Sequence, residues 1–267
     1  MMEIPRLYDI PLWVNALAFL LLLSLAVEAG YRTGLRQRLA NESAERTTRG
    51  DVTLSAMLAL LGLMLAFTYA FTLSRADARK QAIVEEANTI GTAFLKADFL
   101  AEPGRGALRA GLLDYAGTRI ITAEQVKDAA SRRVTLARMA EAQSRLWPAL
   151  EQALRGKPLG PYEASMMQAV TEVLDAQTRR NMAGFDRMPP VVTLLLLAIA
   201  ALSLAVAGHN AGLRGGISRP RMAGFVLILS FLMLVILDFD RPQTGFIRLS
   251  NAPLSSAVED MARVLQN

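Results

Sequence analysis

The chain contains no cysteine and only one histidine, His209. Without cysteine there is no disulfide framework, no thiol nucleophile and no thiolate metal site. The single histidine ends an apolar stretch and has no carboxylate close to it in the sequence, so neither a histidine metal site nor a Ser–His–Asp group can be assembled. The chain also lacks a Gly-rich phosphate loop. These absences argue against enzymatic activity, and we expect the chain not to be an enzyme.

Charge is missing from four long stretches, and the 29 Lys+Arg and 24 Asp+Glu residues crowd between them. A helix of about 20 apolar residues crosses the hydrocarbon core of a bilayer. The stretches therefore predict four transmembrane helices, over residues 11–27, 52–74, 191–208 and 222–237. The net charge of +5 fits membrane orientation and contact with anionic lipid headgroups better than nucleic-acid binding. The expected partner is thus the lipid bilayer.

The first apolar stretch has two interpretations, a cleaved signal peptide or a retained transmembrane helix. Glu28 and Arg32 follow it directly, and no small-x-small cleavage site is evident. Trp13 and Tyr31 flank it, as interfacial aromatic residues do. We favour the retained helix.

The segment between the second and third spans is long, charged and helical in its periodicity. Only the isolated Gly62 and Gly91 interrupt residues 52–100, so the second span is expected to continue into water as one helix. Further helices are expected over residues 107–116, 122–154 and 161–183, the second opened by a capping box at Thr122 and Gln125. The predicted fold is an all-α integral membrane protein with a helical soluble domain inserted between the second and third spans. The domain organisation is 1–74, 75–188 and 189–267.

The second span carries small residues at intervals of four, which place them on one helix face. They are Gly62, Ala66, Ala70 and Ser74. Such a face lets another helix approach closely. One interpretation is ordinary packing inside one subunit, and the other is an oligomer interface or a pore lining. Phe67 and Phe71, on the same span, are candidates for a hydrophobic constriction.

Two carboxylates, Asp238 and Asp240, end the fourth span, and Arg241 follows them. In an extended segment they point the same way and are candidates for a cation site, with calcium as the ion, although calcium needs several more oxygen ligands. The alternative is that they end the span and pair with Arg241 or Arg79.

Glu85, Glu86 and Asn88 form a second polar cluster about three turns beyond the second span. We place them on the polar face of that helix, where they are solvated, pair with nearby basic residues, or ring a pore entrance. Glu28 lies at the end of the first span. It is either a functional intramembrane acid or an interfacial residue that reaches Arg32.

Arginines favour one membrane orientation. Residues 30–51 contain five Arg against three acidic residues, and residues 209–221 contain three Arg and no acidic residue. Short Arg-rich loops stay in the cytoplasm, which puts the large domain in the periplasm of a bacterial inner membrane. Basic residues flanking the large domain, at Arg75, Arg79 and Lys80 and again before the third span, favour the opposite orientation, so a cytoplasmic domain remains open.

Four phrases resemble those of the bacterial bestrophin-like domain proteins. They are EAGYRTG at 28–34, LGLMLAF at 61–67, RKQAIVEEANTIGTA at 79–93 and LDFDRPQTG at 237–245. The family name implies a relation to bestrophins, which are pentameric anion channels with four membrane helices and cytosolic helical extensions. Bestrophins bind calcium through an acidic cluster after the last membrane helix. Here only Asp238 and Asp240 match that cluster, without the longer acidic run.

Two functions follow from these observations. The first is an oligomeric ion channel for anions, a homopentamer by family analogy, with the second span lining the pore. The second is a non-conducting membrane scaffold or sensor whose helical domain binds a partner protein. A transporter with inverted repeats is less well supported, because the two helix pairs show no matched Gly/Pro interruptions.

Overall fold

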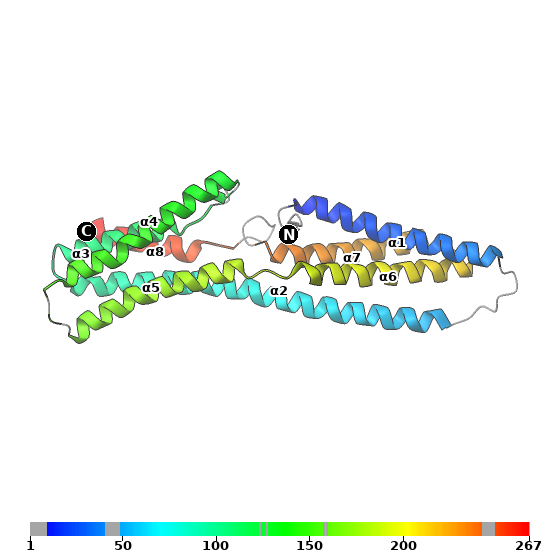
Figure 1. Cartoon of the computed structure of the whole chain (residues 1–267), viewed down its shortest axis with the longest axis horizontal. Helices are drawn as coiled ribbons and strands as arrows, with labels where there is room; N and C mark the ends of the chain where they lie inside the picture. Colours follow the sequence, from blue (N-terminus) through cyan, green and yellow to red (C-terminus); the bar gives the residue numbers. More distant parts are fainter. Residues whose placement is uncertain are drawn as a thin grey trace, which may run out of the picture. The chain divides into compact units, whose positions relative to one another are not determined.

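The computed structural model describes residues 10–266, except for 41–48, 123, 127, 157, 159 and 242–248. Throughout this described part the chain is helical and has no strand (Figure 1). Its elements are α1 (Leu12–Ala40), α2 (Arg49–Lys96), η1 (Ala97–Phe99), α3 (Gly104–Thr118), η2 (Glu124–Val126), α4 (Ala129–Leu154), α5 (Pro161–Phe185), α6 (Pro190–Arg214), α7 (Arg219–Phe239) and α8 (Ala252–Gln266).

Four helical stretches are long and apolar enough to cross a membrane. They are Leu12–Ala40, Asp51–Phe99, Pro161–Arg214 and Arg219–Phe239. Each contains one of the uncharged stretches of the sequence, so the predicted fold class is confirmed. In lipid, a backbone polar group finds its partner only within its own helix, which is why uncharged stretches of this length form helices.

The chain divides into two compact units. The first contains the described residues of Met1–Ser74 and Arg187–Ile247, and the second contains those of Arg75–Asp186 and Arg248–Asn267. We call them the membrane unit and the helical unit. The final helix, α8, belongs to the helical unit, whereas the sequence analysis grouped residues 189–267 together with the last two spans.

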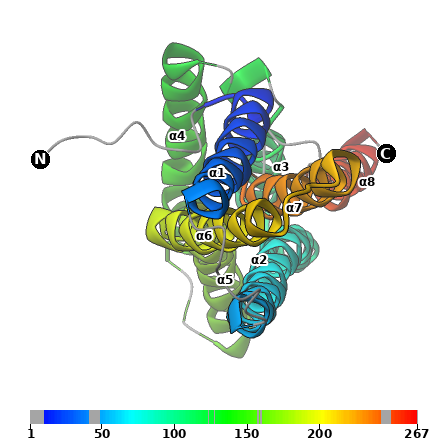
Figure 2. The ribbon, with the colours of Figure 1, turned by 90° about the vertical axis from the view of Figure 1, so that its right-hand side faces the viewer.

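In the membrane unit α1 packs against α6 and α7 (Figures 1 and 2). The contact with α6 is made backbone to backbone at glycines. A Cβ on Gly30 or Gly34 would collide with the carbonyls of Ala205 or His209, and a Cβ on Gly208 or Gly212 would collide with those of Val27 or Tyr31. Both helices thus carry glycines four residues apart where they cross, which lets their axes approach closely.

The helical unit is built from the second half of α2 with α3, α4, α5 and α8. Its core contains side chains from all five helices, among them Ile90, Phe94, Leu112, Leu146, Val170 and Leu254. The helix α8 was not predicted, although Leu254, Val258 and Met261 recur at helical spacing and pack into this core. Burial of that apolar face stabilises a helix that is too short to be stable alone.

The helix α4 begins later than the capping box at Thr122 predicted. Gln125 does accept a hydrogen bond from the Thr122 backbone N–H at 2.9 Å, but this closes the short turn η2. The cap of α4 is Asp128, whose carboxylate accepts from the backbone N–H of Ser131 at 2.7 Å. These hydrogen bonds lower the pKa of Asp128.

Candidate functional site

Within the membrane unit, α2 buries only a narrow stripe of its surface. Leu61, Leu65, Thr68 and Thr72 are buried, at helical spacings of three and four. The two threonine hydroxyls donate to the carbonyls of Met64 and Thr68, both at 2.7 Å, so they need no partner on another helix. Leu61 and Leu65 of this stripe therefore join α2 to the apolar core of the unit.

Much of the α2 span outside this stripe is exposed. Gly62, Ala66 and Ala70 are exposed, and a Cβ on Gly62 would meet no atom within 4 Å. Phe67 and Phe71 are 53% and 66% exposed. The close helix approach in the described part of this unit uses the glycines of α1 and α6, so packing of the small-residue stripe inside one subunit gains no support here. The uncovered face remains available to lipid or to a second copy.

Tyr69 differs from the two phenylalanines of the same span. Its ring meets the ring of Phe239 on α7 edge-on, with the ring centroids 6.0 Å apart. Aromatic pairs favour this geometry. The contact fixes one side of α2 and leaves Phe67 and Phe71 on its uncovered surface.

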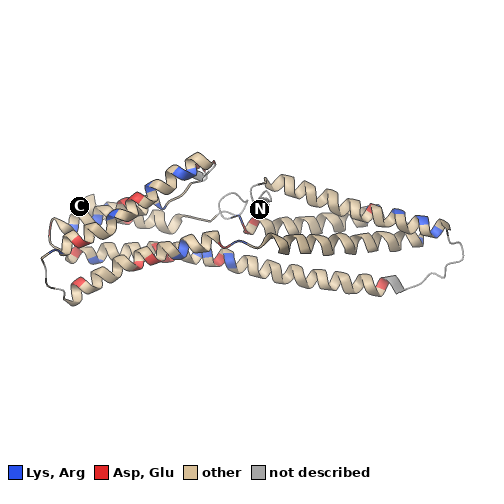
Figure 3. Ribbon diagram, viewed as in Figure 1, with Lys and Arg blue, Asp and Glu red and all other residues tan. Residues whose placement is uncertain are grey.

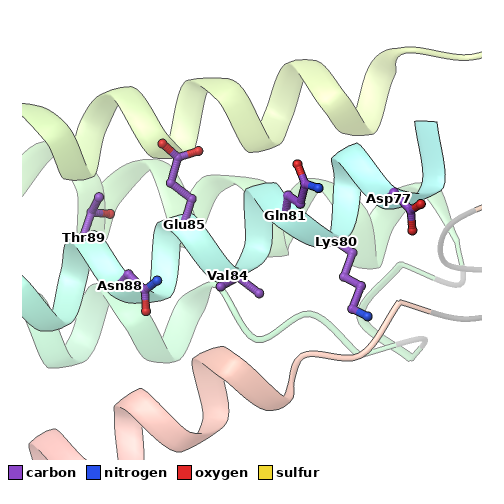
Figure 4. Close-up of a pocket in the computed structure, with 7 residues that line it drawn as sticks. All are labelled: Asp77, Lys80, Gln81, Val84, Glu85, Asn88 and Thr89. Atoms are coloured by element: carbon purple, nitrogen blue, oxygen red, sulfur yellow. The ribbon is translucent and has the colours of Figure 1, made fainter. Parts of the chain in front are cut away.

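In the helical unit α2 again has an uncovered face, and this one is polar. Among the described residues, those that line a pocket of about 430 Å³ belong to this helix, namely Asp77, Lys80, Gln81, Val84, Glu85, Asn88 and Thr89 (Figure 4). Glu85 also accepts a hydrogen bond from Arg179 on α5 at 2.8 Å. The predicted cluster residues Glu85 and Asn88 thus lie on a solvent-facing surface.

Glu86 does not share that surface, so its predicted place on the polar helix face is wrong. Its side chain is 0% exposed, because it lies between Ile83 and Ile90 on the core-facing side of α2. One carboxylate oxygen accepts from Arg119 Nε at 2.6 Å and from the Tyr115 hydroxyl at 3.0 Å. The other accepts from Arg180 Nη1 at 2.5 Å. One carboxylate therefore ties α2 to α3 and α5.

The Glu86 cluster holds two guanidinium groups around a single carboxylate. Arg119 is 1% exposed at the C-terminal end of α3, and its Nη2 donates to Asn181 at 3.2 Å. Arg180 donates in turn to the Arg119 carbonyl at 3.1 Å. Burial raises the pKa of Tyr115 well above its usual range, and the Glu86 carboxylate adds to the shift, so Tyr115 remains a neutral donor. The sequence analysis missed Tyr115, Arg119 and Arg180, which lie far from Glu86 along the chain.

Arg79 is buried and caps the C-terminal end of α5. Its Nε donates to the Ala183 carbonyl at 3.0 Å, and its Nη2 donates to the Asp186 carbonyl at 2.5 Å. The last carbonyls of a helix have no partner within the helix and carry partial negative charge, so a guanidinium group stabilises them. Arg75 adds an ion pair with the Asp186 carboxylate at 3.3 Å.

The extended segment expected at Asp238 and Asp240 is wrong, because Asp238 lies in the last turn of α7 and Asp240 is its C-cap. Both aspartates are buried, with Asp240 at 0% exposure. Asp240 accepts from the backbone N–H of Met188 at 2.8 Å, and Arg241 donates to the Ile10 carbonyl at 2.6 Å. Across the described ranges no three His, Cys, Asp or Glu side chains gather so as to hold a metal ion. Calcium binding by Asp238 and Asp240 therefore stays a prediction. Residues 242–245, which complete the sequence phrase around these aspartates, lie outside the described part.

The opposite end of the membrane unit carries ion pairs on its surface. Arg32 donates to Glu28 at 2.8 Å, one helical turn apart on α1. Arg214 at the end of α6 pairs with Asp51 at the start of α2. His209 lies beside the hydroxyl of Thr33, with 3.1 Å between Nδ1 and Oγ1.

Comparison with known proteins gives one family. A family model described as the Bestrophin-like domain matches residues 18–254, which include all four of the quoted sequence phrases. No curated protein matches the chain.

Proposed function

The chain belongs to the bestrophin-like domain family, and from this membership we propose that it forms an oligomeric ion channel for anions with α2 lining the axis. The observation that carries the proposal is the uncovered face of the α2 span, with Gly62, Ala66, Phe67, Ala70 and Phe71 on it. Small residues let copies of a helix approach one another, and aromatic side chains narrow the space between them.

The polar pocket on α2 in the helical unit supports the same arrangement. Asp77, Lys80, Gln81 and Asn88 offer charges and amide groups on a surface that the described part of the chain leaves exposed. A water-filled passage needs polar walls outside the bilayer and tolerates an apolar constriction inside it. The exposed side chains of α2 are mostly apolar in the membrane unit and mostly polar in the helical unit.

The first test is the stoichiometry of the purified full-length protein, followed by conductance in planar bilayers. We expect a cyclic homo-oligomer, five copies by family analogy, with single-channel currents that reverse near the chloride equilibrium potential. A monomeric particle without an axial cavity, or an oligomer that conducts no ions, contradicts the proposal.

The second test compares two phenylalanines of nearly equal exposure. Phe71 on α2 is 66% exposed, and Phe231 on α7 is 63% exposed. Because Phe71 narrows the proposed axis, Phe71→Ala is expected to change the single-channel conductance about twofold or more. The control Phe231→Ala removes the same ring from another helix and leaves the conductance unchanged. Equal effects of the two substitutions would place the axis elsewhere.

A scaffold or sensor role is the second candidate, and α4 favours it. Leu136 and Trp147 are 56% and 42% exposed on this helix, and their spacing of eleven residues places them on one face. Apolar side chains on one face of a water-facing helix are typical of a protein docking surface. This alternative predicts a monomer or dimer that conducts no ions and purifies with a second protein, which Leu136→Ser with Trp147→Ser would release.

A further inference from the structure

Arginines gather at the end of the membrane unit where α1 and α6 end and α7 begins. The glycine contact between α1 and α6 fixes the last turns of these helices side by side. It brings the guanidinium group of Arg38 against the backbone of Gly215, the left-handed residue that ends α6. The helix α7 starts four residues later with Arg219 and Arg221. The arginines of α1 are visible at this end in Figure 3.

The acidic residues described at this end do not balance the arginines. Glu28 pairs with Arg32, and Asp51 pairs with Arg214. Within the described part of the chain, no ion pair is formed by the four remaining exposed arginines, Arg36, Arg38, Arg219 and Arg221. We call these four residues the arginine cluster. No acidic side chain in the described part of the unit forms an ion pair with the arginine cluster.

The surface next to the arginine cluster is apolar. Leu39 is 72% exposed beside Arg38, and Phe225 and Ile228 are 40% and 65% exposed on α7. A partner that satisfies both features carries negative charge at one end and hydrocarbon at the other. Guanidinium groups bind phosphate oxygens in a bidentate geometry, and clusters of four or more basic residues at the end of a span attract anionic lipids.

We propose that the arginine cluster binds the headgroups of anionic phospholipids. The phosphate groups lie between the ends of α1 and α7, and the acyl chains lie along the exposed apolar side chains of these helices. A free phosphate ion offers the same charge but no hydrocarbon, so a lipid is the better fit to this surface. The inference requires the four spans but not ion conduction, so it can hold or fail independently of the proposed channel.

The test uses the full-length protein in mixed micelles with equal amounts of phosphatidylglycerol and phosphatidylcholine. Native mass spectrometry then counts the lipids that each particle retains. Because each arginine near an anionic surface favours such lipids, we expect about fivefold or greater enrichment of phosphatidylglycerol on the wild-type chain. High salt should reduce the enrichment, since the charges are exposed.

The variant R36Q/R38Q/R219Q/R221Q removes the arginine cluster and should retain both lipids about equally. Its matched control, R132Q/R133Q/R138Q/R145Q, removes four exposed arginines of α4 and should bind lipid as the wild type does. If the first variant fails to insert, R36Q/R38Q and R219Q/R221Q are measured separately, and each is expected to lose part of the enrichment.

Three results would overturn the proposal. The first is equal retention of the two lipids by the wild type, and the second is loss of phosphatidylglycerol from the wild type in millimolar inorganic phosphate. The third is an enrichment that the cluster variants leave unchanged. The second result would identify a site for soluble phosphate instead of lipid. The wild-type measurement alone decides the first two, so the test does not depend on the folding of a variant.

Discussion

Glu86 is a charged residue on the apolar face of α2, and its three partners explain why it is tolerated there. A buried carboxylate is expensive unless hydrogen bonds and opposite charges surround it. Here Arg119, Arg180 and Tyr115 supply both. Because the partners come from α3 and α5, the cluster also selects one arrangement of the three helices.

Replacing Glu86 with Gln should destabilise the helical unit by about 3 kcal/mol or more, because two guanidinium groups lose their buried counter-charge. Fluorescence of Trp147 on α4 reports unfolding of this unit once Trp13 is replaced by Phe. The control is Glu85→Gln in the same background. Its pair with Arg179 is about half exposed, so the expected loss is under about 1 kcal/mol. Equal losses for the two variants would contradict the structural role of the cluster.

The raised pKa of Tyr115 predicts that the unfolding free energy depends on pH. Its pKa is raised in the folded state, so between pH 10 and the folded value the unfolded chain loses this proton and the folded chain keeps it. The contribution to stability is therefore complete below about pH 10 and falls as the pH rises further. The unfolding free energy of the wild type should decrease more steeply than that of Tyr115→Phe, by up to about 1.4 kcal/mol per pH unit. Parallel curves from pH 9 to 11 would contradict the assignment.

The sequence identified Glu86 as a notable residue and misjudged its face. Ile83, Glu86 and Ile90 share one helical stripe, so the spacing contained the signal that Glu86 points inward. A charged residue on such a stripe is usually assigned to the polar face, and only the three-dimensional contact with Arg119 and Arg180 overrides that assignment. These partners lie 33 and 94 residues away in the chain, a distance over which periodicity carries no information.

At the scale of elements, the crossing of α1 and α6 depends on the absence of side chains at four positions. Gly208 meets the backbone of Val27 so closely that a Cβ has no room. Gly208→Leu should therefore separate the helices and destabilise the membrane unit by about 3 kcal/mol. Fluorescence of Trp13 on α1, in a Trp147→Phe background, follows this unit during unfolding in detergent.

The control for that substitution is Gly224→Leu on α7, where a Cβ meets no atom within 4 Å. The two variants add the same side chain to a span, and only the first inserts it between two backbones. We expect the control to unfold like the parent chain. A comparable loss in both variants would mean that the added leucine acts through the bilayer or the detergent and not through the α1–α6 contact.

The helices themselves were largely predictable. The spans follow from uncharged stretches, and α2 continues past the membrane because its sequence offers no breaker until Pro103. The start of α4 and the existence of α8 were harder to predict. Two overlapping capping signals compete at Thr122 and Asp128, and α8 owes its stability to packing against α3. Tertiary contacts decide such elements, and a local pattern describes them only in part.

At the scale of the whole molecule, α2 contributes to both compact units as one helix of 48 residues. It gives each unit a buried stripe and leaves a surface uncovered in each. An oligomer built on the span of α2 would cover the exposed Phe67 and Phe71, which otherwise face lipid.

Membrane orientation depends on how the basic residues are distributed along the whole chain. The arginine cluster lies where α1 and α6 end and α7 begins, and the positive-inside rule predicts that this end of the spans is cytoplasmic. The helical unit would then lie on the periplasmic side of a bacterial inner membrane, opposite to the orientation that the resemblance to bestrophins implies. Because the chain has no cysteine, single substitutions report the side of each end without background.

Two exposed positions make the comparison, Ser144→Cys on α4 of the helical unit and Gly216→Cys between α6 and α7. A maleimide that cannot cross membranes should label Ser144→Cys in intact spheroplasts and reach Gly216→Cys only after the membrane is permeabilised. The reverse pattern would show that the basic residues flanking the helical unit, Arg75, Arg79 and Lys80, outweigh the arginine cluster. That result would contradict the predicted topology. It would not contradict lipid binding by the arginine cluster, because both leaflets of such a membrane contain anionic lipid.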